Sequence, residues 1–149
     1  MLKYQSHFKL TTKKPTYCSY CLLQVIPKIQ NFEVSSPDTD VLLLLVHMYP
    51  QLPTSTVFIT GKSRLKRTIS VCNIFTNLGQ RRASALLGIY ALTGSDMSGR
   101  FAGRTKDWCF KAFMSCDDEI LDALAMLGNA TDLPSEACSQ LERFVCVLY

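Results

Sequence analysis

The chain has one conspicuous aliphatic run, residues 41–46, which follows Asp38 and Asp40 and is closed by Pro50. A membrane-spanning helix takes about 20 apolar residues, so this run is too short to cross a bilayer. Its position between an aspartate and a proline favours a short buried helix, although the pattern also leaves a buried strand open. We therefore expect the chain to build a hydrophobic core around this segment.

Composition agrees with a globular protein. The chain has 149 residues, of which 48% are hydrophobic and 19% are charged, and this length allows one domain with one core. The first 17 residues lack the apolar stretch of a secretory leader. We expect an intracellular protein with no membrane partner, and the nucleus is a candidate compartment.

The seven cysteines argue against a disulfide framework, because their number is odd and no secretory leader precedes them. Cys18 and Cys21 form a C-x-x-C motif, but no second close pair follows at a suitable distance. A structural zinc ion needs four ligands. Reduced thiols are therefore expected, and zinc is not.

The charges are distributed unevenly. Residues 1–82 carry 11 Lys or Arg against three acids, a net charge of +8, whereas residues 83–149 carry five bases and nine acids, a net charge of −4. A basic segment attracts polyanions, above all nucleic acid, because phosphate neutralisation releases counterions. Lys62 and Arg64, in a cationic loop over 61–67, are candidate nucleic-acid contacts; an ordinary solvated surface is the alternative.

The patterns along the chain predict an α/β fold in which strands and helices alternate first and only helices follow. Residues 1–30 are expected to be an irregular basic segment with at most a short strand over 20–26. The expected strands lie at 32–34, 56–60 and 68–69. The expected helices begin after Ser70 and end at Gly79, then cover 82–92, 108–113, 117–127 and a final segment that starts at 132–135.

Ordinary catalytic motifs are absent from the sequence. His7 and His47 are poor candidates for a catalytic base, since His47 lies in an aliphatic environment. Gly61-Lys62-Ser63 resembles the end of a phosphate-binding loop, but position 56, where the first glycine belongs, is Thr56. Carboxylates are therefore the remaining candidates for chemistry.

Asp38 and Asp40 are two residues apart after an expected strand, and strand alternation would place both carboxylates on one face. Asp96 follows an expected helix, where an acid opposes the helix dipole. Together these acids could hold Mg²⁺ or Mn²⁺, which prefer hard oxygen ligands. The alternative is structural: Asp38 caps the next helix, Asp40 lies in its first turn, and Asp96 begins a turn.

Three motifs, in this order, resemble the second half of a PIN-like nuclease domain of the flap endonuclease and XPG type. The segment 32–42 resembles the family's strand that ends in an Asp-x-Asp metal pair. Residues 57–60 resemble the next strand, and Leu92-Thr93-Gly94-Ser95-Asp96 resembles the helix end that carries another metal ligand. The pattern is also similar to mobile-element-related animal proteins with Asp-Thr-Asp-Val-Leu and Leu-Thr-Gly-Cys-Asp signatures.

The resemblance implies a partial PIN-like core with a small mixed or parallel sheet and a C-terminal helical cluster. It implies a Mg²⁺- or Mn²⁺-dependent endonuclease site with Asp38, Asp40 and Asp96 as metal ligands and catalytic residues. The glycine-containing stretch 99–106 is similar to the family's turn that grips the DNA backbone. Its bases would hold phosphates of DNA or RNA: Arg100, Arg104 and Lys106.

The chain departs from the family at two places. Glu33 is the sole acid before Asp38, whereas the family has further acids upstream, and Gly103 is not followed by a second glycine. We therefore expect residues 31–149 to be a truncated or degenerate nuclease-like domain. The alternatives are a non-catalytic nucleic-acid-binding module, or a protein-interaction remnant that docks through the acidic face of 117–122.

Overall fold

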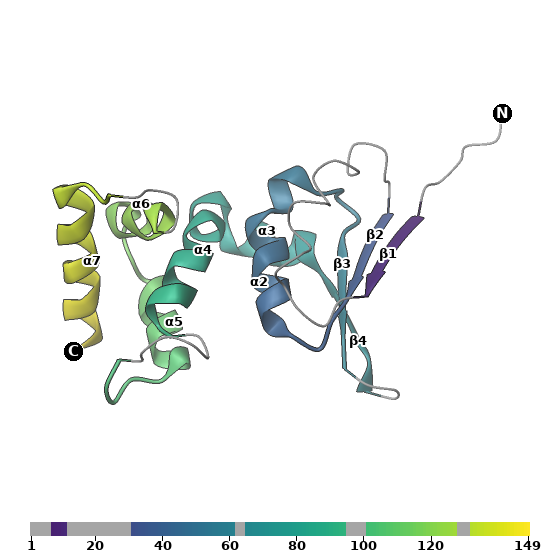
Figure 1. Ribbon diagram of the computed structural model, residues 1–149, viewed down its shortest axis with the longest axis horizontal. Coiled ribbons are helices and arrows are strands. Elements are labelled where there is room, and N and C mark those ends of the chain that lie inside the picture. Colours follow the sequence, from purple (N-terminus) through teal and green to yellow (C-terminus); the bar gives the residue numbers. More distant parts are fainter. Residues whose placement is uncertain (1–6, 12–30, 62–64, 95–100, 128–131) are drawn as a thin grey trace. The chain divides into compact units, whose positions relative to one another are not determined.

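The computed structural model describes residues 7–11, 31–61, 65–94, 101–127 and 132–149. The chain divides into two compact units, Met1–Leu78 and Gly79–Tyr149. The first unit contains a sheet with helices, and the described part of the second is helical (Figure 1). The protein is therefore a mixed α/β protein, as the sequence predicts.

The sheet of the first unit has four strands in the order β1-β2-β3-β4. β1 and β2 are parallel, β2 and β3 are parallel, and β3 and β4 are antiparallel, so the sheet is mixed. Burial alternates along β2, where Phe32 and Val34 are fully buried. The strands are β1 (His7–Thr11), β2 (Asn31–Ser35), β3 (Val57–Thr60) and β4 (Arg67–Ser70).

The expectation of an irregular segment over 1–30 needs correction at β1, which pairs with β2 from His7 opposite Asn31 to Thr11 opposite Ser35. A boundary at residue 30 would therefore separate two hydrogen-bonded strands. The compact units instead divide after Leu78. The strand expected over 20–26 lies outside the described residues.

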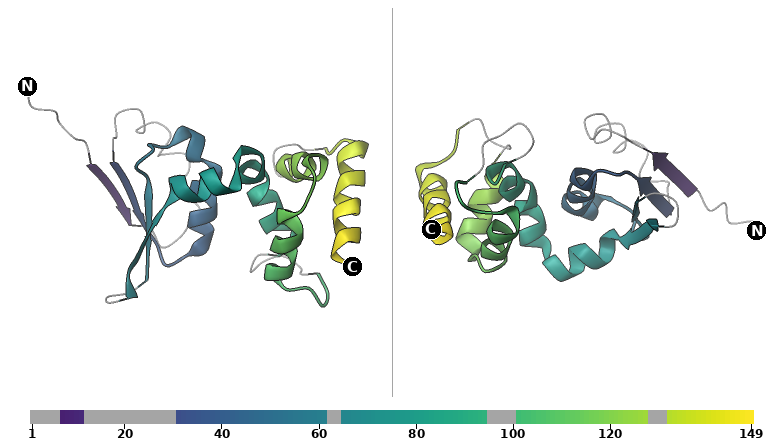
Figure 2. Two further views of the ribbon diagram at one scale, coloured as in Figure 1. Left: turned by 180° about the vertical axis from the view of Figure 1, so that it is seen from behind. Right: turned by 90° about the horizontal axis from the view of Figure 1, so that it is seen from below.

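The aliphatic run forms a helix, α2 (Thr39–His47), followed by the short 3-10 helix η3 (Tyr49–Gln51). Together they connect the parallel strands β2 and β3. Val41, Leu45 and Val46 of α2 are buried. α2 packs on α3 (Val71–Leu78), and both helices lie on one side of the sheet (Figures 1 and 2).

β3 and β4 form the hairpin that the sequence predicts around the cationic loop. Gly61 has a φ of 89°, and a Cβ at this position would lie 2.3 Å from the backbone oxygen of Leu65. Only glycine therefore fits the start of the turn. After β4, the Ser70 hydroxyl oxygen accepts a hydrogen bond from the backbone N–H of Asn73 at 3.3 Å, which confirms the predicted cap of α3.

The second unit has a core of aliphatic and aromatic side chains from all four described helices, and Phe113, Leu124 and Phe144 are fully buried. α4 packs on α6, and α6 packs on α7. The helices are α4 (Gln80–Leu92), α5 (Lys106–Met114), α6 (Asp118–Met126) and α7 (Ser135–Leu148).

α4 and α6 approach closely at Gly88. A Cβ on this buried residue would lie 1.9 Å from the backbone oxygen of Leu124, well inside any contact distance. A side chain there would force the two helices apart. Gly88 is thus a packing residue of the second unit.

Among the described residues, none of the helices is both long and apolar enough to traverse a membrane.

Candidate acidic site and nucleic-acid interface

Asp38 is the N-cap of α2. Its backbone is extended, and its Oδ1 accepts a hydrogen bond from the backbone N–H of Asp40 at 3.0 Å. The backbone N–H of Asp38 in turn donates to the hydroxyl oxygen of Ser36 at 3.1 Å. These bonds satisfy one of the free donors at the helix start and hold the turn between β2 and α2.

The expected arrangement of the two acids on one face of a strand is wrong. β2 ends at Ser35, so Asp38 and Asp40 lie beyond it, at the start of a helix. Both positions are favourable for acids, since the N-terminus of a helix carries a partial positive charge. The capping role accounts for the placement of Asp38 without a cation.

The acids nevertheless lie in a place that suits a ligand site. They follow the carboxyl end of β2, which is parallel to its neighbours β1 and β3. In α/β sheets, ligands bind beyond the carboxyl ends of parallel strands. Asp38 and Asp40 are each partly exposed there.

The donor set at this place is chemically right for Mg²⁺ or Mn²⁺ but small. Carboxylate oxygens are the ligands that these ions prefer. Within the described residues, however, no group of three or more His, Cys, Asp or Glu side chains is placed to hold a metal ion. The third predicted ligand, Asp96, lies outside the described residues. Two carboxylates can supply only part of the octahedral set of oxygen ligands that such an ion takes, so water would have to supply the rest.

Like the predicted metal ligands, the predicted phosphate-binding residues lie partly inside and partly outside the described residues. Lys62, Arg64 and Arg100 lie outside the described residues, whereas Arg104 and Lys106 are described. Both described cations lie over aromatic rings of the second unit. The guanidinium carbon of Arg104 is 5.1 Å from the ring centre of Trp108 and 5.0 Å from that of Tyr149.

Lys106, the first residue of α5, has its Nζ 4.6 Å from the ring centre of Tyr90 on α4. Such distances are those of cation–π contacts. Among the described residues, no carboxylate pairs with the positive charge of either Lys106 or Arg104.

The acids of the α6 face are paired within the second unit. Arg81 forms ion pairs with Asp118 and Asp122. Arg143 pairs with Asp117 and with Glu119, the latter at 3.3 Å.

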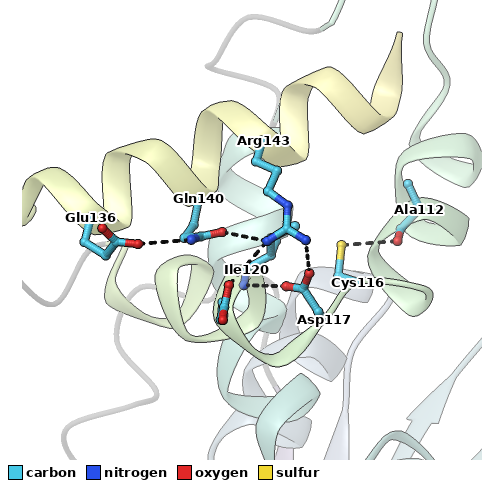
Figure 3. A network of polar contacts seen from close by, with 8 residues as sticks. Ala112, Cys116, Asp117, Ile120, Glu136, Gln140 and Arg143 are labelled. Carbon is cyan, nitrogen blue, oxygen red and sulfur yellow. Dashed lines mark hydrogen bonds and ion pairs between the residues drawn. The ribbon is translucent and has the colours of Figure 1, made fainter.

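Figure 3 shows Arg143 reaching from α7 to Asp117 at the start of α6. Gln140 and Glu136 continue this network along α7, with the Gln140 amide donating to Glu136 at 3.2 Å. The face predicted as a docking surface therefore has its charges partly neutralised by two arginines. This use of the acids favours a structural role for them.

A shallow hollow of about 310 Å³ adjoins this network. Its lining comes from α6, from α7 and from Pro134 just before α7, and it combines apolar side chains with carboxylates. The lining residues include Ala123, Met126, Pro134, Ala137, Glu119 and Glu136.

The chain was compared with protein-family models, curated proteins and solved structures, and no significant match was found in any of the three. The resemblance to PIN-like nucleases therefore rests on the sequence motifs alone.

Sequence reasoning missed the aromatic partners Tyr90, Trp108 and Tyr149. Arg104 and Trp108 are four residues apart, but Arg104 precedes the N-cap Thr105, so the spacing rule for side chains within a helix does not predict their contact. The contacts of Tyr90 and Tyr149 depend on how distant segments pack, and no local pattern indicates them.

Proposed function

We propose that this protein is a nuclease-related domain of PIN-like type that binds nucleic acid and has a reduced acidic site. Asp38, Asp40 and Asp96 would hold a divalent cation, Mg²⁺ or Mn²⁺. When bound, such an ion supplies activation of water and stabilisation of the leaving oxygen in phosphodiester hydrolysis. Cations in both units would hold the phosphate backbone.

The single observation that carries the proposal is the position of Asp38 and Asp40 where the chain leaves β2 and enters α2, at the N-cap and in the first turn of the helix. They follow the carboxyl end of a strand flanked by parallel neighbours. This is where an Asp-x-Asp metal pair belongs in the family that the motifs resemble. The charge of the first unit supports a polyanionic partner, since Met1–Leu78 contains nine Lys or Arg and three acids.

Binding without catalysis is the second candidate function. The hydrogen bond from Asp40 N–H to Asp38 favours it, because this bond gives the acidic pair a purpose that needs no metal. Arg104 and Lys106 favour it as well, since each lies over an aromatic ring and neither pairs with a carboxylate of the described residues. In this form the protein would hold nucleic acid and leave it intact.

A cleavage assay separates the two candidates. Purified protein is incubated with Mn²⁺ and labelled single-stranded or branched DNA, and the products are compared with those of Asp40→Asn. We expect slow cleavage by the natural protein and none by the variant. Asp132→Asn, at an exposed acid outside the site, is the matched control and should cleave normally. Equal cleavage by all three proteins would exclude catalysis at this site.

Binding is tested separately by titrating labelled DNA at several salt concentrations without a divalent ion. We expect the affinity to fall steeply as salt rises, since each phosphate contact releases counterions. Salt-independent affinity, or no binding at all at low salt, would contradict the proposed nucleic-acid function. Binding without Mn²⁺-dependent cleavage would select the second candidate.

A further inference from the structure

The most unusual surface of the second unit is an exposed group of aromatic rings around Arg104. Trp108 is 50% exposed and Tyr149 is 65% exposed, although large aromatic residues are usually well buried. Phe110, on the same helix as Trp108, is 43% exposed. We call Arg104, Trp108 and Tyr149 the aromatic platform.

The platform is ordered by contacts of its own. The Tyr149 hydroxyl donates to the backbone oxygen of Ala102 at 3.0 Å, and the Trp108 backbone N–H donates to the Thr105 hydroxyl at 3.2 Å. The first bond ties the Tyr149 ring to the turn that carries Arg104, and the second fixes the backbone of Trp108 at the start of α5. The Trp108 ring itself is contacted by the Arg104 guanidinium. A ligand that used the rings would therefore meet surfaces that are already in place.

Arg104 belongs to the platform through its guanidinium, which lies over both rings. Its Nε is buried and has no hydrogen-bond partner among the described residues. Within the described parts of the chain, the side chain is thus contacted by the two rings and by no carboxylate. It brings a positive charge to an aromatic surface, and Lys106 brings a second charge nearby in the sequence.

Exposed aromatic rings beside cations that pair with no described carboxylate match one ligand class in particular. In single-stranded nucleic acid the bases are free to stack on aromatic rings while the phosphates meet the cations. In a duplex the bases are paired inside the helix and cannot reach a protein ring without being flipped out. An acidic peptide would satisfy the cations but leave the rings without flat partners.

We propose that the aromatic platform binds single-stranded nucleic acid by stacking bases on both Trp108 and Tyr149, with Arg104 and Lys106 holding the adjacent phosphates. This inference rests on the proposed nucleic-acid function and names its substrate class. It also assigns Trp108 and Tyr149 to recognition, a role that the PIN-like resemblance does not give them.

The test uses the whole protein and three labelled probes: a mixed-sequence 20-nucleotide DNA strand, its duplex, and a strand of equal length with abasic sites throughout. The abasic strand has the same phosphates but no bases to stack. We expect the natural protein to prefer the single strand over the abasic strand. We expect Trp108→Ala to lower the affinity for the single strand at least about fivefold, the lower end of a base–aromatic stack, and to leave the abasic affinity nearly unchanged.

Further measurements distinguish a loss of base stacking from misfolding of the Trp108→Ala variant. Trp108 is the chain's single tryptophan, so in the natural protein its fluorescence should be quenched by the single strand and not by the abasic strand. Val147→Ala removes an exposed apolar side chain from α7 and should keep the natural affinity. The helical circular dichroism of both variants is compared with that of the natural protein.

The outcomes separate this inference from the proposed function. Binding of all three probes with equal affinity, unchanged in Trp108→Ala and with no quenching, would overturn the aromatic platform and leave phosphate binding in place. Failure to bind any probe at low salt would overturn both proposals. A single-strand preference that is lost in Trp108→Ala, together with quenching in the natural protein, would support both.

Discussion

The Oδ1 atom of Asp38 accepts a hydrogen bond from the backbone N–H of Asp40 at 3.0 Å, so two acids of one predicted metal pair are first of all partners at a helix start. The carboxyl group of Asp38 has a second oxygen, and metal binding and capping are compatible uses of one side chain. Substitutions that keep one use and remove the other can therefore distinguish them.

We expect Asp38→Asn to leave stability nearly unchanged, because asparagine caps helices about as well as aspartate does. Asp38→Ala should lower the free energy of unfolding by about 1 kcal/mol, since it removes the cap. Urea denaturation followed by circular dichroism measures both changes. If Mn²⁺ binds at this site, both variants should weaken its binding, as measured by the paramagnetic signal of free Mn²⁺. Equal stability of Asp38→Ala and Asp38→Asn would show that the cap contributes little.

The fold of the first unit was largely predictable, because its signals are local. The aliphatic run after Asp40, the alternation in Phe32-Glu33-Val34 and the hairpin at Gly61 each specify one element through neighbouring residues. β1 was not predicted, since its place beside β2 depends on pairing across about 20 intervening residues. A short basic segment such as this one shows no hydrophobic periodicity from which the pairing could be predicted.

In the second unit, too, local patterns predict the helices but not their exact ends or their long-range contacts. The helix expected over 117–127 begins at Asp118, and Asp117 is its N-cap, whose Oδ1 accepts a hydrogen bond from the backbone N–H of Ile120 at 3.1 Å. The pairing of Arg143 with Asp117 spans 26 residues. It depends on how α6 and α7 pack, so the sequence pattern does not predict it.

For the candidate site, the structure corrects the expected geometry, because Asp38 and Asp40 lie at a helix start and not on one face of a strand. The roles assigned to the predicted metal ligands and phosphate contacts stay predictions. Asp96 and Arg100 also lie outside the described part of the chain.

Gly88→Ala is expected to destabilise the second unit strongly. The added methyl group would lie 1.9 Å from the backbone oxygen of Leu124, and backbone atoms cannot move aside as a flexible side chain can. Overpacking of this kind costs about 1–3 kcal/mol or more. Trp108 fluorescence follows the urea unfolding of the second unit. Ala91→Ser, at an exposed position of the same helix, is the control, and an equal effect of the two substitutions would contradict the close approach.

Arg143→Ala is expected to have a small and salt-dependent effect. Arg143 pairs with Asp117 and Glu119, but the three side chains remain about half exposed or more. Exposed ion pairs contribute about 1 kcal/mol or less, and salt screens them. The difference in unfolding free energy from the natural protein should therefore shrink in 1 M NaCl. A large difference that salt does not reduce would instead indicate that the methylene groups of Arg143 provide packing.

The thiol of Cys116 should make the second unit less stable at alkaline pH. Burial, and then the Asp117 carboxylate, raise the pKa of this thiol from 9.0 to about 11, and the thiol donates a hydrogen bond to the backbone oxygen of Ala112 at 3.3 Å. Between about pH 9 and pH 11 the folded protein keeps this proton while the unfolded chain loses it. Unfolding then releases a proton, so the stability falls as the pH rises through this window.

Urea midpoints measured by circular dichroism from pH 8 to pH 11 test this dependence. We expect Cys116→Ala to show a shallower decline than the natural protein, because its unfolding no longer releases the thiol proton. Cys138→Ala, at an exposed cysteine of α7, should decline as the natural protein does. At pH 8, Cys116 should also react with a maleimide more slowly than Cys138, since thiolate is the reactive form. Parallel declines in all three proteins would show that the Cys116 proton has no measurable influence on folding.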